Sequence, residues 1–276
     1  MQPTIVFEPH IPTALQRALE YAGEDGFVAS LPQLLHARAN APYDNIIWNT
    51  WFTSNSEECV IETPQGNHVV VAVHGGGILA TPERFERSLN ADMDHRNLEG
   101  ITGGATKITS QEARDVLDGK LPNGIEIPIY PFDEFRRGIN DLPIRYAVIT
   151  DLELARKTEK GFTPFEVLKE EPNFIVRAGG VEAAAAYLDR FQARHDTKLM
   201  GNFHPFRWVD PNKPQTRAIF LAGNKGGEGS EGDYFYGYDS DYGIGGWAHM
   251  VGMARYVAVA PRDVSVSGLR SQDFKP

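Results

Sequence analysis

The chain has 276 residues, of which 41% are hydrophobic and 23% are charged, a balance typical of a globular protein with a sizeable core. Its net charge of -10 argues against nucleic acids and anionic membranes as partners, because both attract basic surfaces. The single cysteine excludes an internal disulfide and a thiolate zinc cage, and no apolar run reaches the length of a membrane span. Residues 1–12 lack the basic start and apolar centre of a secretory leader, so we expect one soluble, cytoplasmic domain over residues 1–276.

Two helices and a strand are predicted first along the chain. Thr13 to Gln16 reads as a capping box for a helix that Gly23 can end. Ser30 can cap a second short helix, with Pro32 in its first turn. Ile46–Thr53 is rich in β-branched and aromatic residues, which favour a strand.

A β-hairpin is expected next. Cys59–Glu62 and His68–Val73 read as strands, and the Pro- and Gly-containing segment Thr63–Asn67 between them has turn chemistry. This places antiparallel strands in the N-terminal half. We interpret the cysteine as a packing residue, because the carboxylates of Glu57 and Glu58 beside it would raise the pKa of its thiol.

The middle of the chain alternates between the two kinds of element. A helix is predicted from Thr81 through Leu89, and another from the capping box of Thr109 and Glu112 to Gly119. Four further segments read in turn as strand, helix, strand and helix: Arg145–Thr150, Thr163–Glu170, Asn173–Ala178 and Val181–His195. This order is typical of a βαβ-like unit, so we predict a mixed α/β or α+β fold.

The last part of the chain changes character. Arg217–Ala222 reads as a strand, and Trp247–Ala260 is apolar again. Between them, Gly223–Gly246 is rich in Gly, Asp and Tyr. We predict that this loop is mobile when empty and becomes ordered over a ligand, because its glycines are costly to fix and its tyrosines are amphipathic.

The most informative segment for function is the apolar run Val69–Val73 followed by His74, Gly75, Gly76 and Gly77. A buried strand that ends in glycines offers bare backbone N–H groups to a ligand or an oxyanion. The segment resembles the oxyanion-hole segment of lipases and esterases of the α/β-hydrolase fold. That family also uses a serine in a G-x-S-x-G elbow, which this sequence lacks. We predict that the glycine tip lines a concave site with His74 as general acid or base; an ordinary tight turn is the alternative.

A second candidate lies before the Ala-rich helix. Gly179 and Gly180 precede it, and Arg177 lies just upstream. A helix that begins behind two glycines presents its positive end to an anion. The alternative is a tight turn that lets the helix pack closely.

Histidines supply the remaining candidates. His249 follows two glycines and Trp247, and we predict that it belongs to the same site as His74; a half-buried histidine is the alternative. Three ligands could come together only through the fold, from the set His74, His95, His204, His249, Asp92 and Asp94. We favour separate hydrogen-bonded histidines over a shared metal site for that set. Whether the protein binds a metal stays open.

Two further patterns in the C-terminal region are incomplete. The glycines at 227, 229 and 232 have dinucleotide-binding spacing, but the residues after them are a poor helix start. Asp239, Asp241 and Gly243 form half of a calcium loop and lack the later bidentate glutamate.

Two classes of function follow from these patterns. The first is a soluble enzyme, such as a hydrolase, that acts on a small polar or anionic molecule with His74 as general acid or base. The second is a non-catalytic ligand- or carbohydrate-binding protein that uses the Gly/Tyr/Trp-rich C-terminal region, including Tyr238 and Trp247. A histidine beside another titratable group in a pocket would favour the enzyme. The patterns predict neither a cofactor nor an oligomeric state.

Overall fold

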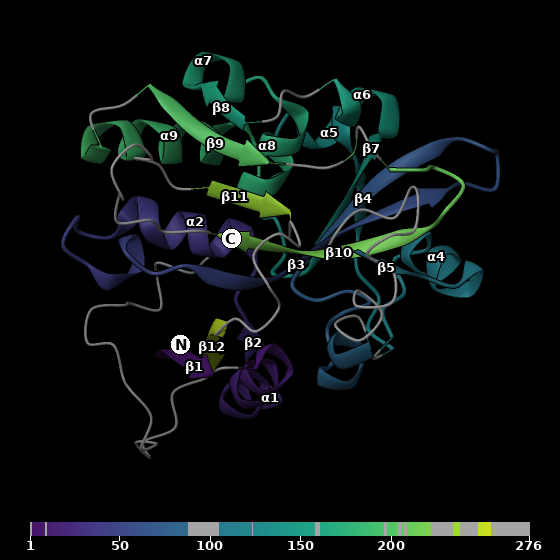
Figure 1. Cartoon of the computed structure of the whole chain (residues 1–276), viewed down its shortest axis with the longest axis horizontal. Helices are drawn as coiled ribbons and strands as arrows, with labels where there is room; N and C mark the ends of the chain where they lie inside the picture. The colour runs from purple at the N-terminus through teal and green to yellow at the C-terminus, as the bar shows by residue number, and fades with distance from the viewer. Residues whose placement is uncertain are drawn as a thin grey trace.

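The computed structural model contains two β-sheets with helices packed around them (Figure 1). It describes residues 2–8, 10–87, 105–122, 124–157, 161–195, 198–203, 206, 209–221, 234–237 and 248–254. Over these ranges, no helix combines the length and the apolar character needed to cross a bilayer.

The larger sheet has nine strands among the described residues. Eight lie side by side in the order β6 (Ile129–Pro131), β7 (Tyr146–Asp151), β4 (His68–His74), β3 (Phe52–Glu62), β10 (Gln215–Leu221), β11 (Tyr234–Gly237), β9 (Leu199–Phe203) and β8 (Gly161–Pro164). The ninth, β5 (Thr106–Lys107), pairs with β10. The pairs β6–β7 and β9–β11 are parallel and the others are antiparallel, which confirms the predicted mixed fold class.

The predicted hairpin is confirmed as β3 and β4. Val60 lies opposite Val70 in their antiparallel ladder, and the N–H of Thr63 donates to the carbonyl of Asn67 at 2.8 Å across the turn. Val69–Val73 is buried throughout, because β3 and β7 flank it and helices cover both faces of the sheet.

The smaller sheet joins the two ends of the described chain. Its central strand β12 (Ala248–Ala254) lies between β1 (Gln2–Glu8) and β2 (Phe27–Val28), and Gln2 pairs with Ala254. Helix α1 (Ile11–Ala22) covers this sheet, as Figure 1 shows. The helix approaches so closely that a Cβ on Gly252 would lie 2.8 Å from the carbonyl oxygen of Ala18.

Helices cover both faces of the larger sheet. On one face α2 (Leu31–Asn40), α8 (Pro172–Ala178) and α9 (Val181–His195) pack together over a core that includes Trp48. On the other face α4 (Ser110–Leu117) packs against Cys59, Val71 and Val73. The remaining α-helices with both ends among the described residues are short: α5 (Phe132–Phe135), α6 (Leu152–Arg156) and α7 (Phe165–Leu168). Residues 82–87 are also helical.

Local signals predict several elements well. The Val181–His195 helix is confirmed residue for residue as α9. Helix α4 has the predicted capping box, in which the N–H of Glu112 donates to Thr109 Oγ1 at 3.1 Å and the N–H of Thr109 to Glu112 Oε2 at 2.8 Å. The box at Thr13 is wrong, since α1 already begins at Ile11, with Pro12 in its first turn.

The main correction concerns Asn173–Ala178, which is helix α8 and not a strand. Pro172 starts this helix, and Gly179 ends it with a left-handed φ of 91°. A short apolar run has no periodicity that separates a buried helix from a buried strand. The parallel βαβ-like unit lies earlier in the chain, where β6, α5 and β7 follow one another.

Two other predicted elements are divided in the structure. Ile46–Thr53 begins as the 3-10 turn η1 (Ile46–Trp48), since the Asn45 side chain accepts the N–H of Ile47 at 3.1 Å, and β3 starts only at Phe52. Thr163–Glu170 contains the end of β8 and then α7. Single-domain organisation stays a prediction.

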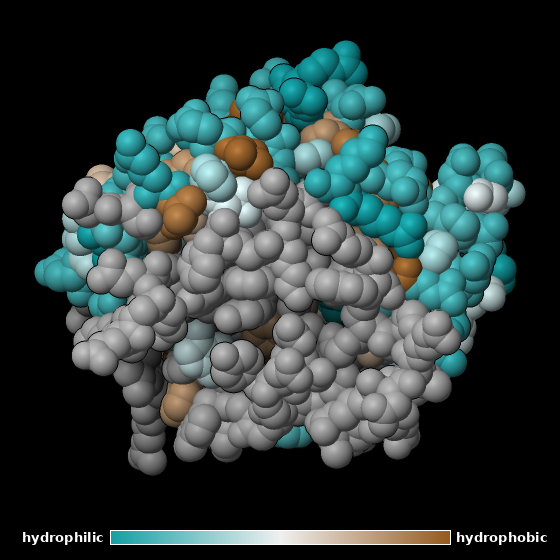
Figure 2. Space-filling view, turned by 45° about the horizontal axis from the view of Figure 1, so that its top comes forward, coloured by the Kyte–Doolittle hydropathy of each residue, from teal (hydrophilic) through white to brown (hydrophobic). Residues whose placement is uncertain are grey.

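The described surface is largely hydrophilic. Its exposed large apolar residues are spread over separate elements: Phe7, Ile46, Val167, Val181 and Leu199. Figure 2 shows apolar residues in separate spots on the coloured part of one face. Scattered residues of this kind are normal on a globular protein and do not mark a docking surface.

Gly26 offers a test of the close packing between α1 and the smaller sheet. A Cβ at this position would collide with the carbonyl oxygens of Ala22 in α1 and Met253 in β12. We expect Gly26→Ala to lower the free energy of unfolding by about 3 kcal/mol, measured by urea denaturation.

Gly66→Ala is the matched control. Gly66 lies in the hairpin turn with a φ of 81°, and the nearest atom to its Cβ position is 3.8 Å away. In this variant the free energy of unfolding should fall by only about 1 kcal/mol, which is the cost of placing an alanine in left-handed backbone. Equal losses in the two variants would contradict the packing described for Gly26.

Candidate functional site

His74 lies at the end of β4 and is fully buried. Its Nε2 is 3.1 Å from the carbonyl oxygen of Val176 in α8, and its Nδ1 is 2.9 Å from Ser56 Oγ in β3. A carbonyl oxygen only accepts, so Nε2 carries the proton and Nδ1 accepts from the Ser56 hydroxyl. The same hydroxyl oxygen accepts the N–H of Leu31 at 2.9 Å.

These contacts use both ring nitrogens inside the protein. Burial lowers the pKa of His74 to about 4, and the neighbouring Arg177 acts in the same direction, so the ring is neutral at neutral pH. A general acid or base must reach its substrate within hydrogen-bond distance. His74 instead uses its ring to link its own strand, β4, to β3 and α8. It is therefore a hydrogen-bonded histidine of the core.

The glycine tip after His74 is also satisfied internally. The N–H groups of Gly75 and Gly76 both donate to the carbonyl of Asn55 at 2.9 Å. Their φ angles are 90° and 107°, and a Cβ on Gly75 would lie 2.7 Å from Arg145 Cγ. The glycines therefore allow a left-handed turn that brings neighbouring segments close.

The carboxyl group of Glu57 in β3 meets the turn that directly follows this tip. Its Oε1 accepts the N–H of Ile78 at 2.6 Å and its Oε2 accepts the N–H of Leu79 at 2.8 Å. A Cβ on Gly77 would collide with the same carboxylate. Burial raises the pKa of Glu57, while the two N–H groups and the charge of Arg84 act against that rise.

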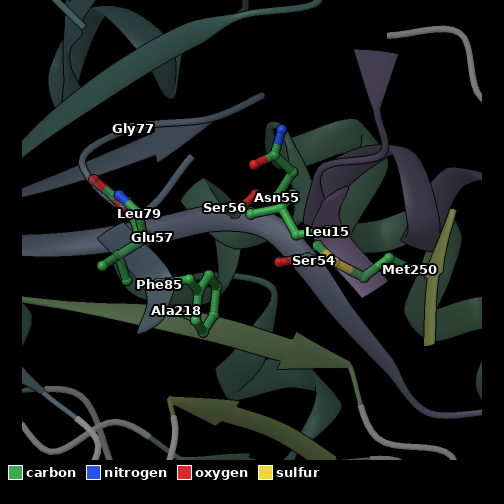
Figure 3. A pocket seen from close by; sticks show the side chains of 10 residues that line it. All are labelled: Leu15, Ser54, Asn55, Ser56, Glu57, Gly77, Leu79, Phe85, Ala218 and Met250. Atoms are coloured by element: carbon green, nitrogen blue, oxygen red, sulfur yellow. Dashed lines mark hydrogen bonds between the residues drawn. The ribbon is translucent and has the colours of Figure 1, made fainter. Parts of the chain in front are cut away.

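A small cavity lies beside Glu57 and Gly77 (Figure 3). Its other lining residues come from α1, β3, the segment after β4, β10 and β12: Leu15, Ser54, Asn55, Ser56, Leu79, Phe85, Ala218 and Met250. The space is on the order of one water molecule, too small for a substrate. Of the predicted tip, Gly77 lines this cavity, whereas Gly75 and Gly76 do not.

Arg177 is held by an internal carboxylate as well. Its Nε donates to Glu58 Oε1 at 2.7 Å and its Nη2 to Glu58 Oε2 at 2.8 Å, and both side chains are buried. Gly179 and Gly180 close the end of α8, because their N–H groups donate to the carbonyls of Val176 and Ile175 at 3.2 and 2.9 Å. This is the tight-turn alternative for the glycine pair. An anion at the first turn of α9 is not tested by these contacts and stays a prediction.

The structure does not bring the backbones of the two predicted catalytic histidines into one sheet. His249 lies in β12 of the smaller sheet, opposite Phe7, whereas His74 ends β4 of the larger sheet. The pairing of their side chains in one site is not tested by this placement and stays a prediction.

Several other candidates lie outside the described residues. These are Tyr238, Trp247, His95, His204, Asp92, Asp94, the glycines at 227, 229 and 232, the Asp239–Gly243 pattern and most of the loop 223–246. Within the described ranges, no group of three or more His, Cys, Asp or Glu side chains is placed to hold a metal. The packing role of Cys59 is confirmed: its thiol is buried, and burial together with the charge of Glu57 raises its pKa.

Sequence reasoning missed Ser56, Glu57 and Glu58 as the organising residues. The available signal was an acidic pair next to the Cys59–Glu62 strand, in a stretch that we did not assign to any element. Unpaired carboxylates are rarely buried, so acidic residues in a buried strand indicate specific internal partners.

Comparison with known proteins supports the fold. No family model and no curated protein sequence matches the chain. One solved structure is similar, described by the words "Accommodation of massive sequence variation in Nanoarchaeota by the C-type lectin fold". The match covers 91% of this chain and 97% of that one, with a TM-score of 0.64 and 25% sequence identity. The chain thus has a structural neighbour with a C-type lectin fold.

The buried, neutral state of His74 predicts a specific dependence of stability on pH. In the unfolded chain the ring binds a proton below its ordinary pKa of 6.5, whereas in the folded chain it stays neutral down to about pH 4. The stabilising contribution is therefore present above pH 6.5 and is lost as the pH falls toward 4. Over this window the loss is about 3 kcal/mol, and it should be absent in His74→Gln.

Urea denaturation across this pH range measures the difference between wild type and variant, which removes the contributions of other groups. Ser56→Ala is the control, because it removes one hydrogen bond of the ring and keeps the ring buried. It should retain the pH slope of the wild type. A wild-type slope matching that of His74→Gln would show that the ring binds its proton as readily in the folded chain as in the unfolded chain.

Glu57 predicts a second stability effect. Glu57→Ala leaves the N–H groups of Ile78 and Leu79 without their acceptor, so we expect a loss of about 3 kcal/mol in the free energy of unfolding. Hydrogen exchange of these two amides should also become faster.

Glu62→Ala on the same strand is the matched control, since Glu62 is exposed at the end of β3. It should stay within about 0.5 kcal/mol of wild type. Unchanged amide exchange in Glu57→Ala would rule out the carboxylate as the acceptor that holds this turn.

Proposed function

We propose that the protein is a non-catalytic ligand-binding protein built on a C-type lectin scaffold, with carbohydrate or another small polar molecule as its ligand. One observation carries the proposal: the structural match to a protein with the C-type lectin fold, which covers nearly all of both chains. Fold alone does not fix function, so the recognition chemistry must come from residues of this chain.

The described interior supports a scaffold role. His74, Glu57 and Arg177 each have partners within the protein, and these partners join different strands and helices. All three residues are buried. The hydrolase hypothesis draws no support from this geometry.

The proposed recognition segment is the Gly/Tyr/Trp-rich region, with Tyr238 and Trp247 as its aromatic contacts. The segment 238–247 starts where β11 ends in the larger sheet and stops where β12 begins in the smaller sheet. Tyrosine and tryptophan offer an apolar face and a polar edge to a ligand, and the segment's Asp residues can accept hydrogen bonds from sugar hydroxyls.

The description of the similar structure as a fold that accommodates massive sequence variation supports this division of labour. We propose for this chain that the strands and buried side chains maintain the fold, while substitutions in 238–247 change what is bound. A cytoplasmic location remains part of the proposal, on the basis of the single cysteine.

A glycan array probed with the full chain, followed by calorimetric titration with the glycan that binds best, tests the proposal. Tyr238→Ala and Trp247→Ala should each weaken binding at least tenfold, about 1.4 kcal/mol, because aromatic contacts dominate such surfaces. The melting temperature should stay close to that of wild type.

Val167→Ala is the control. It truncates an exposed apolar side chain on α7 and should leave affinity unchanged. Failure of the full chain to bind any glycan on the array would count against a carbohydrate ligand. Turnover of a bound compound that is lost in His74→Gln at an unchanged melting temperature would instead favour the hydrolase hypothesis.

A further inference from the structure

Arg217 is a buried cation whose hydrogen bonds are incomplete. It lies on β10 opposite Glu58 of β3, and its side chain has no exposed surface. Its Nη2 lies 3.3 Å from Gln215 Oε1. Its Nε and Nη1, which carry three of the five N–H bonds of a guanidinium, have no hydrogen-bond partner.

The guanidinium groups of the other two buried arginines in the described residues make short hydrogen bonds. Arg177 makes two short hydrogen bonds to Glu58. Arg38 donates to the carbonyls of Ile47 and Thr50 at 2.8 and 2.6 Å. Arg217 is thus the exception among the buried arginines of the described chain.

The charge of Arg217 is also not balanced. Both carboxylate oxygens of Glu58 are engaged by Arg177, and no carboxylate lies within ion-pair distance of Arg217 among the described residues. Burial lowers the pKa of Arg217 to about 10, and the charge of Arg177 adds to this while Glu58 opposes it. The side chain is therefore charged at neutral pH.

A single aromatic contact does not replace a counter-ion. Arg217 Cζ lies 5.7 Å from the centre of the Phe206 ring, a distance at which the attraction is modest. An unpaired charge in the interior costs several kcal/mol, and a cation of this kind is stabilised when an anion or a strong acceptor completes its shell.

We propose that Arg217 binds a small monovalent inorganic anion of the halide class in the interior of the protein. The single negative charge of such an anion balances the positive charge of Arg217, with which Glu58 makes no ion pair. The full burial of Arg217 favours a compact ion over a large ligand. The anion accepts hydrogen bonds from Nε or Nη1, next to Phe206, and stabilises the folded state in which these groups are assembled.

The position also has a consequence for the strands around it. On the edge of β10 away from β3, β5 pairs with Gln215 and Thr216, and β11 pairs with Ile219 to Leu221. Arg217 lies between these two paired stretches. The anion is therefore placed where two short strands share one edge of β10, and its loss should loosen both.

Thermal unfolding of the full chain, in chloride or in gluconate at equal ionic strength, is the first test. Gluconate is too large to take the place of a halide. Chloride should raise the melting temperature of wild type in a saturable way, by about 5 °C at full occupancy. Arg217→Met should abolish this shift, because it removes the cation and leaves the Arg177–Glu58 pair in place.

Arg136→Met is the matched control, since Arg136 makes only an exposed ion pair with Glu170. It should keep the chloride-dependent shift of wild type. Equal melting temperatures of wild type in the two salts overturn the proposal, as does an equal chloride shift in wild type and Arg217→Met.

A crystal grown in bromide tests the site directly and does not depend on a variant that folds. An anomalous peak within hydrogen-bond distance of Arg217 Nε or Nη1 is expected. Water molecules alone at both nitrogens, or a carboxylate of the chain itself on Arg217, overturn the proposal.

Discussion

Three successive polar residues of one buried strand hold the described structure together. Ser56, Glu57 and Glu58 lie in the middle of β3, and each one bonds to a different segment. Ser56 joins Leu31 of α2 to His74 of β4, Glu57 holds the turn after β4, and Glu58 pairs with Arg177 of α8. Removing one partner of such a buried pair leaves an uncompensated charge and costs about 3–5 kcal/mol.

The alternation of side chains along a strand explains why these three reach different places. Ser56 and Glu58 point to the same face, where α2 and α8 pack. Glu57 points to the opposite face, toward residues 77–79 and the cavity that β12 and α1 help to line. The side chains of β3 thereby hold the helices on one face of the larger sheet. On the other face they hold residues 77–79, which lie close to the smaller sheet.

The sequence predicts an element well when the residues that stabilise it are close together in the chain, and poorly when they are far apart. The capping box of α4 spans four residues, and the hairpin turn spans five, so the sequence predicts both. Helix α9 carries its own propensity and apolar stripe over fifteen residues. Helix α8 has only seven residues, and its burial comes from packing against α2, α5, α6 and α9, which a local pattern does not record.

The candidate site was less predictable because its partners lie far apart in the chain. Glu57 is 21 residues from the N–H that it accepts, and Glu58 is 119 residues from Arg177. No spacing rule connects such residues. The composition of the strand was nonetheless informative, since carboxylates beside a buried cysteine need partners.

The turn after β4 differs from the predicted site in both its donors and its acceptor. The sequence predicts glycine N–H groups that meet a ligand, whereas those of Gly75 and Gly76 donate to Asn55 and those of Ile78 and Leu79 donate to Glu57. Glu57 comes from the neighbouring strand, and Gly77 is small enough to let its carboxyl group approach. An acidic residue on the strand expected to pair with a glycine-tipped strand is therefore evidence for an internal partner. Where that strand offers none, the same tip remains a candidate for an external ligand.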